Sequence, residues 1–270
     1  MNERPLFFEQ KDHRLFGVMH IPEEGEVKRA FVFCHPFGEE KLWAHRVYVS
    51  FARELAARGF LVLRFDYTGY GDSEGDFSQS TLAVQLQDID RAVRLVKEYS
   101  PSVSEVGFLG LRLGATLALM AADRLGQNGP LILWDPVVDG ERFIQEFLRS
   151  NLTTQLAVYG EVRVNRDQLV EKLRNGEIVN VDGYDLSYPV YEQIAGIQLL
   201  DSDLSAGRPG LIVQIGRTDR PKKEFQEISQ LLGADLRCVV EEPFWREIKR
   251  FYGKAPNLFD ATLEWLENLT

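Results

Sequence analysis

Apolar residues follow two alternating patterns along this chain. The first is a short, mainly apolar run, typical of a strand buried on both faces of a sheet. It occupies residues 30–34, 60–65, 106–109, 131–134, 211–215 and 236–240, and it is unbroken at residues 30–34. The second is the three- and four-residue spacing of a helix face, seen at Leu82, Leu86, Ile89, Val93 and Val96 and again at Phe259, Thr262, Leu266 and Leu269. Alternating strands and helices predict an α/β fold, with a mainly parallel sheet and helices on both faces. Residues 6–8 and 15–19 predict an antiparallel pair of strands at one edge.

Residues 137–208 interrupt this alternation. The segment has no strong apolar run, and it is polar and rich in acidic side chains. A long excursion between two core strands is typical of a cap over the carboxyl ends of the sheet. We therefore predict a core made of residues 1–136 and 209–270, and a helical cap insertion at residues 137–208. The alternative is a solvated insertion without a role.

Charge and cysteine content narrow the class of protein. The 270 residues include 31 basic and 41 acidic side chains, a net charge of −10, which argues against a nucleic-acid or membrane-surface binder. Two cysteines are too few for a disulfide framework. The first residues lack the apolar segment of a secretory signal, and no apolar stretch approaches the roughly 20 residues of a spanning helix. We expect a cytoplasmic protein with no membrane insertion.

Four short motifs follow predicted strands, at the sheet edge where open α/β sheets bind ligands. They are Cys34-His35-Pro36-Phe37-Gly38-Glu39, the glycine-rich segment 66–75, Gly110-Leu111-Arg112-Leu113-Gly114, and Gly216-Arg217-Thr218-Asp219. Their order and spacing resemble the α/β-hydrolase superfamily, in particular its serine-aminopeptidase-like branch. The resemblance covers nearly the whole chain outside the predicted cap, and it implies the α/β-hydrolase fold.

The resemblance also implies roles for particular residues. The loop with His35, Phe37 and Gly38 would supply one backbone N–H of an oxyanion hole, most simply that of Phe37, and Leu113 would supply the second. The position of the nucleophilic serine is occupied by Arg112. No serine lies between Ser104 and Ser150, and a guanidinium with a pKa above about 12 is not an acyl-accepting nucleophile.

The other two triad positions differ from each other. Asp219 stands where the family has its catalytic acid, after the penultimate core strand. The family's catalytic histidine follows the last core strand, but all four histidines of this chain precede residue 46. The sequence therefore predicts a degenerate triad, with Arg112 and Asp219 at two of its positions and no histidine at the third.

Three roles for Arg112 follow from its expected place in the pocket. It could pair with Asp219 or Asp135 and close the former site, because a buried guanidinium needs a carboxylate partner. It could instead bind a carboxylate or phosphate ester together with the two oxyanion N–H groups. A third possibility is a rearranged hydrolytic or lyase site that uses His35 with Glu39 or Glu40, although orienting the oxyanion loop is the simpler role for His35.

Three functions remain open on this basis. The first is a non-catalytic relative of the hydrolases that binds a small or acyl-type ligand, or a partner protein. The second is an esterase, another hydrolase or an acyltransferase-like enzyme with a non-standard site around His35, Asp135 or Asp219. The third is a scaffold subunit with a closed pocket. No metal or nucleotide motif occurs, so no cofactor is predicted.

A weaker resemblance is carried by the segments 133–140 and 243–245, which are similar to hydrolase-like proteins associated with bacterial exosortase systems. This resemblance implies a bacterial protein near envelope or polysaccharide biogenesis and does not specify a reaction.

Overall fold

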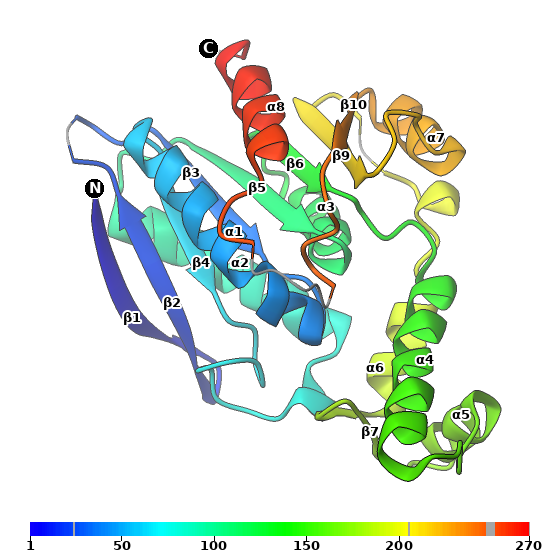
Figure 1. The fold of residues 1–270 in the computed structure, drawn as a ribbon. Helices are drawn as coiled ribbons and strands as arrows, with labels where there is room; N and C mark the ends of the chain where they lie inside the picture. The colour runs from blue at the N-terminus through cyan, green and yellow to red at the C-terminus, as the bar shows by residue number, and fades with distance from the viewer. Residues whose placement is uncertain (24, 205, 247–251, 270) are drawn as a thin grey trace.

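Eight strands form one sheet in the order β1-β2-β4-β3-β5-β6-β9-β10 in the computed structural model, which describes residues 1–23, 25–204, 206–246 and 252–269 (Figure 1). The strands are β1 (Asn2–Gln10), β2 (His13–Ile21), β3 (Arg29–Cys34), β4 (Leu61–Phe65), β5 (Glu105–Leu111), β6 (Leu131–Trp134), β9 (Gly210–Gly216) and β10 (Asp235–Val240). The β1–β2 and β2–β4 pairs are antiparallel, and the remaining neighbours are parallel. Every predicted apolar run lies in a parallel strand, and the N-terminal pair forms an edge, so the predicted fold class is confirmed.

Helices cover both faces of this sheet because successive side chains of each strand point to opposite sides. On β3, Phe31 and Phe33 enter one core cluster, whereas Ala30, Val32 and Cys34 enter the other. The first cluster is covered by α1 (Glu39–Ala57) and α8 (Pro256–Glu267), and the second by α2 (Leu82–Tyr99), α3 (Leu113–Leu125) and α7 (Lys223–Leu232). The two helices that the sequence spacing predicted correspond to α2 and α8.

The segment between β6 and β9 contains mixed secondary structure. Its elements are α4 (Gly140–Tyr159), α5 (Arg166–Arg174), β7 (Val179–Val181), β8 (Tyr184–Leu186), α6 (Tyr188–Ala195) and the short 3₁₀ helix η2 (Leu199–Asp201). The β7–β8 hairpin turns through Asp182 and Gly183, both with positive φ, and it packs against a second 3₁₀ helix, η1 (Phe77–Gln79). Figure 1 shows α4, α5 and α6 standing beyond one end of the sheet. The segment thus contains three helices and a hairpin that the sequence did not predict.

None of the helices in the described part of the chain combines the length and the apolar character that crossing a bilayer requires.

Candidate functional site

The turn from β5 into α3 holds Arg112 in a backbone conformation that side chains rarely adopt, with φ 55° and ψ −124°. The flanking glycines make this turn possible. A Cβ on Gly110 would collide with the backbone of Gly114, and a Cβ on Gly114 would collide with the backbone carbonyl of Cys34. The sharp turn therefore places the side chain of residue 112 at the carboxyl edge of the sheet. Strained positions of this kind cluster at functional sites.

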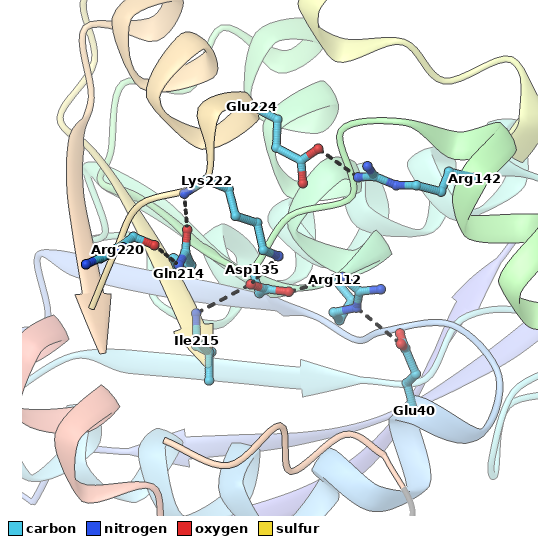
Figure 2. Close-up of polar contacts among 9 residues, drawn as sticks. All are labelled: Glu40, Arg112, Asp135, Arg142, Gln214, Ile215, Arg220, Lys222 and Glu224. Atoms are coloured by element: carbon cyan, nitrogen blue, oxygen red, sulfur yellow. Dashed lines mark hydrogen bonds and ion pairs between the residues drawn. The ribbon is translucent and has the colours of Figure 1, made fainter. Parts of the chain in front are cut away.

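Two carboxylates hold the guanidinium of Arg112 (Figure 2). Nε donates to Oε1 of Glu40 at 3.2 Å, and Nη1 donates to Oδ2 of Asp135 at 3.1 Å. The rings of Phe143 and Trp245 flank the group, with centroids 5.6 and 5.7 Å from Cζ. Only 13% of the Arg112 side chain is exposed. Arg112 is thus a buried cation whose charge is matched by ion pairs and aromatic faces.

Glu40 and Asp135, the two acids that bind the guanidinium of Arg112, lie in different environments. Glu40 lies in the first turn of α1, and its second oxygen is buried without a hydrogen-bond partner in the described structure. Burial raises the pKa of Glu40 above its usual value, and the nearby Arg112 offsets this only in part. Burial also disfavours the charged form of Arg112, but Glu40 and Asp135 outweigh that effect and raise the pKa of Arg112.

Asp135 follows β6 and is almost completely buried, at 3% exposure. Its backbone also has positive φ, at 45°. Its Oδ1 accepts from the N–H of Ile215 at 3.4 Å and lies 3.8 Å from Nζ of Lys222 (Figure 2). Asp135 therefore links the ends of β5, β6 and β9 through one carboxylate.

A cavity of about 420 Å³ opens beside this cluster. Charged side chains dominate its lining, and they are Arg112, Asp135, Asp139, Arg142, Glu146, Lys222, Lys223, Glu224 and Arg246. The apolar part of the wall consists of Pro136, Val137, Val138, Phe143 and Phe225. Arg142 on α4 forms an ion pair with Glu224 on α7 at 2.8 Å, which joins these two helices at the cavity.

The expected oxyanion loop lies outside this cavity lining. Phe37 is 2% exposed, and its ring centroid lies 5.2 Å from that of Phe77 and 5.0 Å from that of Phe147. Gly38 has φ 54°, and a Cβ there would touch Phe147 on α4. Leu113 is buried at the first position of α3. Aromatic side chains therefore occupy the space next to Phe37 and Gly38.

His35 is not among the residues that line the cavity either. It is 2% exposed and stacks on Tyr48 with ring centroids 4.9 Å apart. Its Nδ1 atom is buried without a hydrogen-bond partner in the described structure. Burial lowers the pKa of His35 well below its usual value, so the imidazole is neutral near pH 7.

The structure thus brings together some of the residues singled out from sequence and leaves others apart. Of the two acids expected to pair with Arg112, Asp135 does so, whereas Asp219 is exposed and is not among the hydrogen-bond partners of Arg112 in the described structure. Sequence reasoning considered Glu40 only as a companion of His35, and it missed Arg142 and Lys222. Glu40 had one signal, its place just after the motif that contains His35.

The described residues contain no group of three or more His, Cys, Asp or Glu side chains that could hold a metal ion.

The sheet order, the strained turn into α3 and the charged site at the carboxyl edge define an α/β-hydrolase fold. A family model described as serine aminopeptidase S33 matches residues 25–184, and the chain belongs to this family. None of the curated protein sequences matches the chain significantly.

Solved structures with the same fold include Est1E, an esterase and a proline iminopeptidase-related protein. Est1E from Butyrivibrio proteoclasticus is 16% identical, covers 98% of each chain and has a TM-score of 0.66. A Pyrococcus furiosus esterase is 18% identical, covers 99% of this chain and 91% of that one, and has a TM-score of 0.65. A proline iminopeptidase-related protein from Thermus thermophilus is 19% identical, covers 100% and 99%, and has a TM-score of 0.64. Each of these likenesses concerns the fold.

Proposed function

We propose that this chain is a non-hydrolytic member of its family that binds a small polar ligand in the cavity beside Arg112. The observation that carries the proposal is the identity and surroundings of the side chain at the β5–α3 turn. That side chain is a guanidinium paired with Glu40 and Asp135. A protonated guanidinium has no lone pair available to attack a carbonyl carbon.

The surroundings of the histidines support the same proposal. A general base must come within hydrogen-bond reach of the group that it deprotonates. His35 stacks on Tyr48 and does not line the cavity, and His20 accepts a hydrogen bond from Arg64 within the β2–β4 region. His13 lines a different and smaller cavity. The alternative of a working hydrolase with a non-standard site would therefore require a base other than these three side chains.

The cavity favours a ligand-binding protein over a scaffold with a closed pocket. Its volume of about 420 Å³ is in the range of small-molecule sites. The aromatic packing around Phe37 favours a compact polar ligand over a long acyl chain, because Phe77 and Phe147 occupy the neighbouring space.

We infer in addition that residues 137–208 act as the cap of this site. Arg142 and Phe143 on α4 line the cavity, and the Arg142–Glu224 ion pair connects α4 to the core helix α7. Both cysteines are free thiols, which fits the expected cytoplasmic location.

The proposal is tested by labelling with a fluorophosphonate, a probe that reacts with activated serines, followed by intact-mass measurement. The wild-type chain and an Arg112→Ser variant are both expected to remain unlabelled, because the variant regains a serine without a base to activate it. Stoichiometric labelling of the wild type would contradict the proposal. Labelling of Arg112→Ser alone would show that a base is present.

A further inference from the structure

Most of the carboxylates that line the Arg112 cavity are already engaged by other groups of the protein. Of its acidic side chains, Asp135 is paired with Arg112, and Glu224 is paired with Arg142. Asp139 caps α4 by accepting from the N–H of Arg142 at 2.9 Å. Three of the four lining carboxylates are therefore already engaged.

The cationic side chains that line the cavity have more hydrogen-bond donors without a partner among the described residues. The side-chain hydrogen bonds of Arg112 to other described residues use Nε and Nη1, which Figure 2 shows, and leave Nη2 available. Nζ of Lys222 lies 3.8 Å from Asp135, beyond hydrogen-bond distance, and 49% of the Lys222 side chain is exposed. Arg246 lines the same cavity, is exposed, and acts on Glu40 through its charge without a side-chain hydrogen bond to any described residue. Three cationic donor groups thus face the cavity with unused hydrogen-bonding capacity.

Lys222 is held in place by backbone contacts. Its N–H donates to the side chain of Gln214 at 2.6 Å, and the amide of Gln214 in turn donates to the carbonyl of Arg220 at 2.8 Å (Figure 2). Its Nζ lies 4.8 Å from the ring centroid of Phe225, another lining residue. The segment before α7 therefore presents this ammonium to the cavity from a fixed backbone.

We propose that the ligand of this cavity is a small organic anion, whose carboxylate or phosphate group is bound by Arg112, Lys222 and Arg246. Oxyanions are the natural partners of guanidinium and ammonium donors in a partly buried site. The wall formed by Val138, Phe143 and Phe225 accommodates a short apolar body attached to that group. This inference rests on the proposed function, and it names the class of ligand that the site takes.

Isothermal titration calorimetry on the whole chain tests the inference, with phenylacetate, phenyl phosphate and the neutral isostere 2-phenylacetamide as probes. We expect at least one of the anions to bind saturably, more weakly as salt rises, and the amide to show no binding. The anion that binds more tightly identifies the headgroup. Absence of binding by both anions, or equal binding of the amide, would overturn the inference.

Variants at two exposed positions locate the site while leaving the ion pairs of Arg112 with Glu40 and Asp135 in place. Lys222→Gln and Arg246→Gln are each expected to weaken anion binding about tenfold, the effect of losing one charge-assisted hydrogen bond. Lys28→Gln is the control, because Lys28 is 70% exposed and precedes β3 at the opposite end of the sheet. Unchanged affinity in both cavity variants would contradict the proposed site.

The same titrations separate this inference from the proposed function. If the chain hydrolyses an ester and the anions inhibit competitively, the site is correct and the non-hydrolytic function is wrong. If no ester is hydrolysed and neither anion binds, the function stands and the ligand class is wrong.

Discussion

Removing the guanidinium at residue 112 should cost far more stability than removing an exposed one. In Arg112→Met, Glu40 and Asp135 lose their shared partner while remaining in place, with side chains 21% and 4% exposed. Breaking a buried ion pair by deleting one partner costs about 3 to 5 kcal/mol. We expect a loss of about 3 kcal/mol, because Lys222 remains near Asp135. In a chain of this size, that loss lowers Tm by about 6 to 12 °C.

The pH dependence identifies the origin of this loss. Without Arg112, the folded-state pKa of Glu40 rises further above its unfolded value, because burial disfavours the charge and the nearest cation is gone. The protonated carboxyl stabilises the folded variant at low pH, and this contribution disappears as pH rises through the folded pKa. The stability difference from wild type should therefore be smaller at about pH 5 than at about pH 8.

Urea denaturation followed by circular dichroism measures the effect at both pH values. The control is Arg217→Met, which removes an arginine that is 81% exposed and should change stability by less than about 0.5 kcal/mol. Adding Glu40→Gln and Asp135→Asn to Arg112→Met should restore most of the lost stability. A loss below about 1 kcal/mol, or one that does not vary with pH, would refute the reasoning.

Two further predictions concern the buried Asp88 and the turn from β5 into α3. Asp88 is fully buried, one of its oxygens accepts from the N–H of Thr68 at 2.8 Å, and burial raises its pKa to about 6. Because the neutral acid is favoured in the fold, this residue destabilises the protein as pH rises from about 4 to 7. The stability of Asp88→Asn relative to wild type should increase over that interval by up to about 3 kcal/mol, and a constant difference in urea titrations would contradict this. Gly114→Ala should destabilise the protein by about 3 kcal/mol, because the added Cβ collides with the Cys34 carbonyl. Gly216→Ala is the control, because a Cβ there meets open space and should leave stability unchanged. Equal Tm values for these two variants would show that the turn can relax.

The sequence was informative where burial leaves a local pattern. The parallel strands are predictable because a strand covered on both faces must be apolar throughout, as residues 30–34 are. The β5–α3 turn is predictable from Gly110 and Gly114, since neither position tolerates a Cβ. The β7–β8 hairpin was missed because its strands have only three residues each, although the Asp182-Gly183 pair was a turn signal.

The partners of Arg112 were harder to predict because they depend on distances across the chain. Glu40 lies 72 residues before Arg112, and Asp135 lies 23 residues after it. From its motif alone, Asp219 is as good a partner for Arg112 as Asp135 is. The positive φ of Asp135 and its contact with Ile215 place its carboxylate under Arg112, and no sequence motif encodes that orientation.

The most direct test of the non-hydrolytic function is steady-state hydrolysis of p-nitrophenyl esters with short and long acyl chains by the wild-type protein. The measurement should be made across about pH 6 to 9, where a catalytic histidine would titrate, and compared with heat-denatured protein. We expect no saturable turnover at any chain length or pH. Saturable turnover that is lost in His35→Ala would contradict the account, because it would make the buried imidazole a working base.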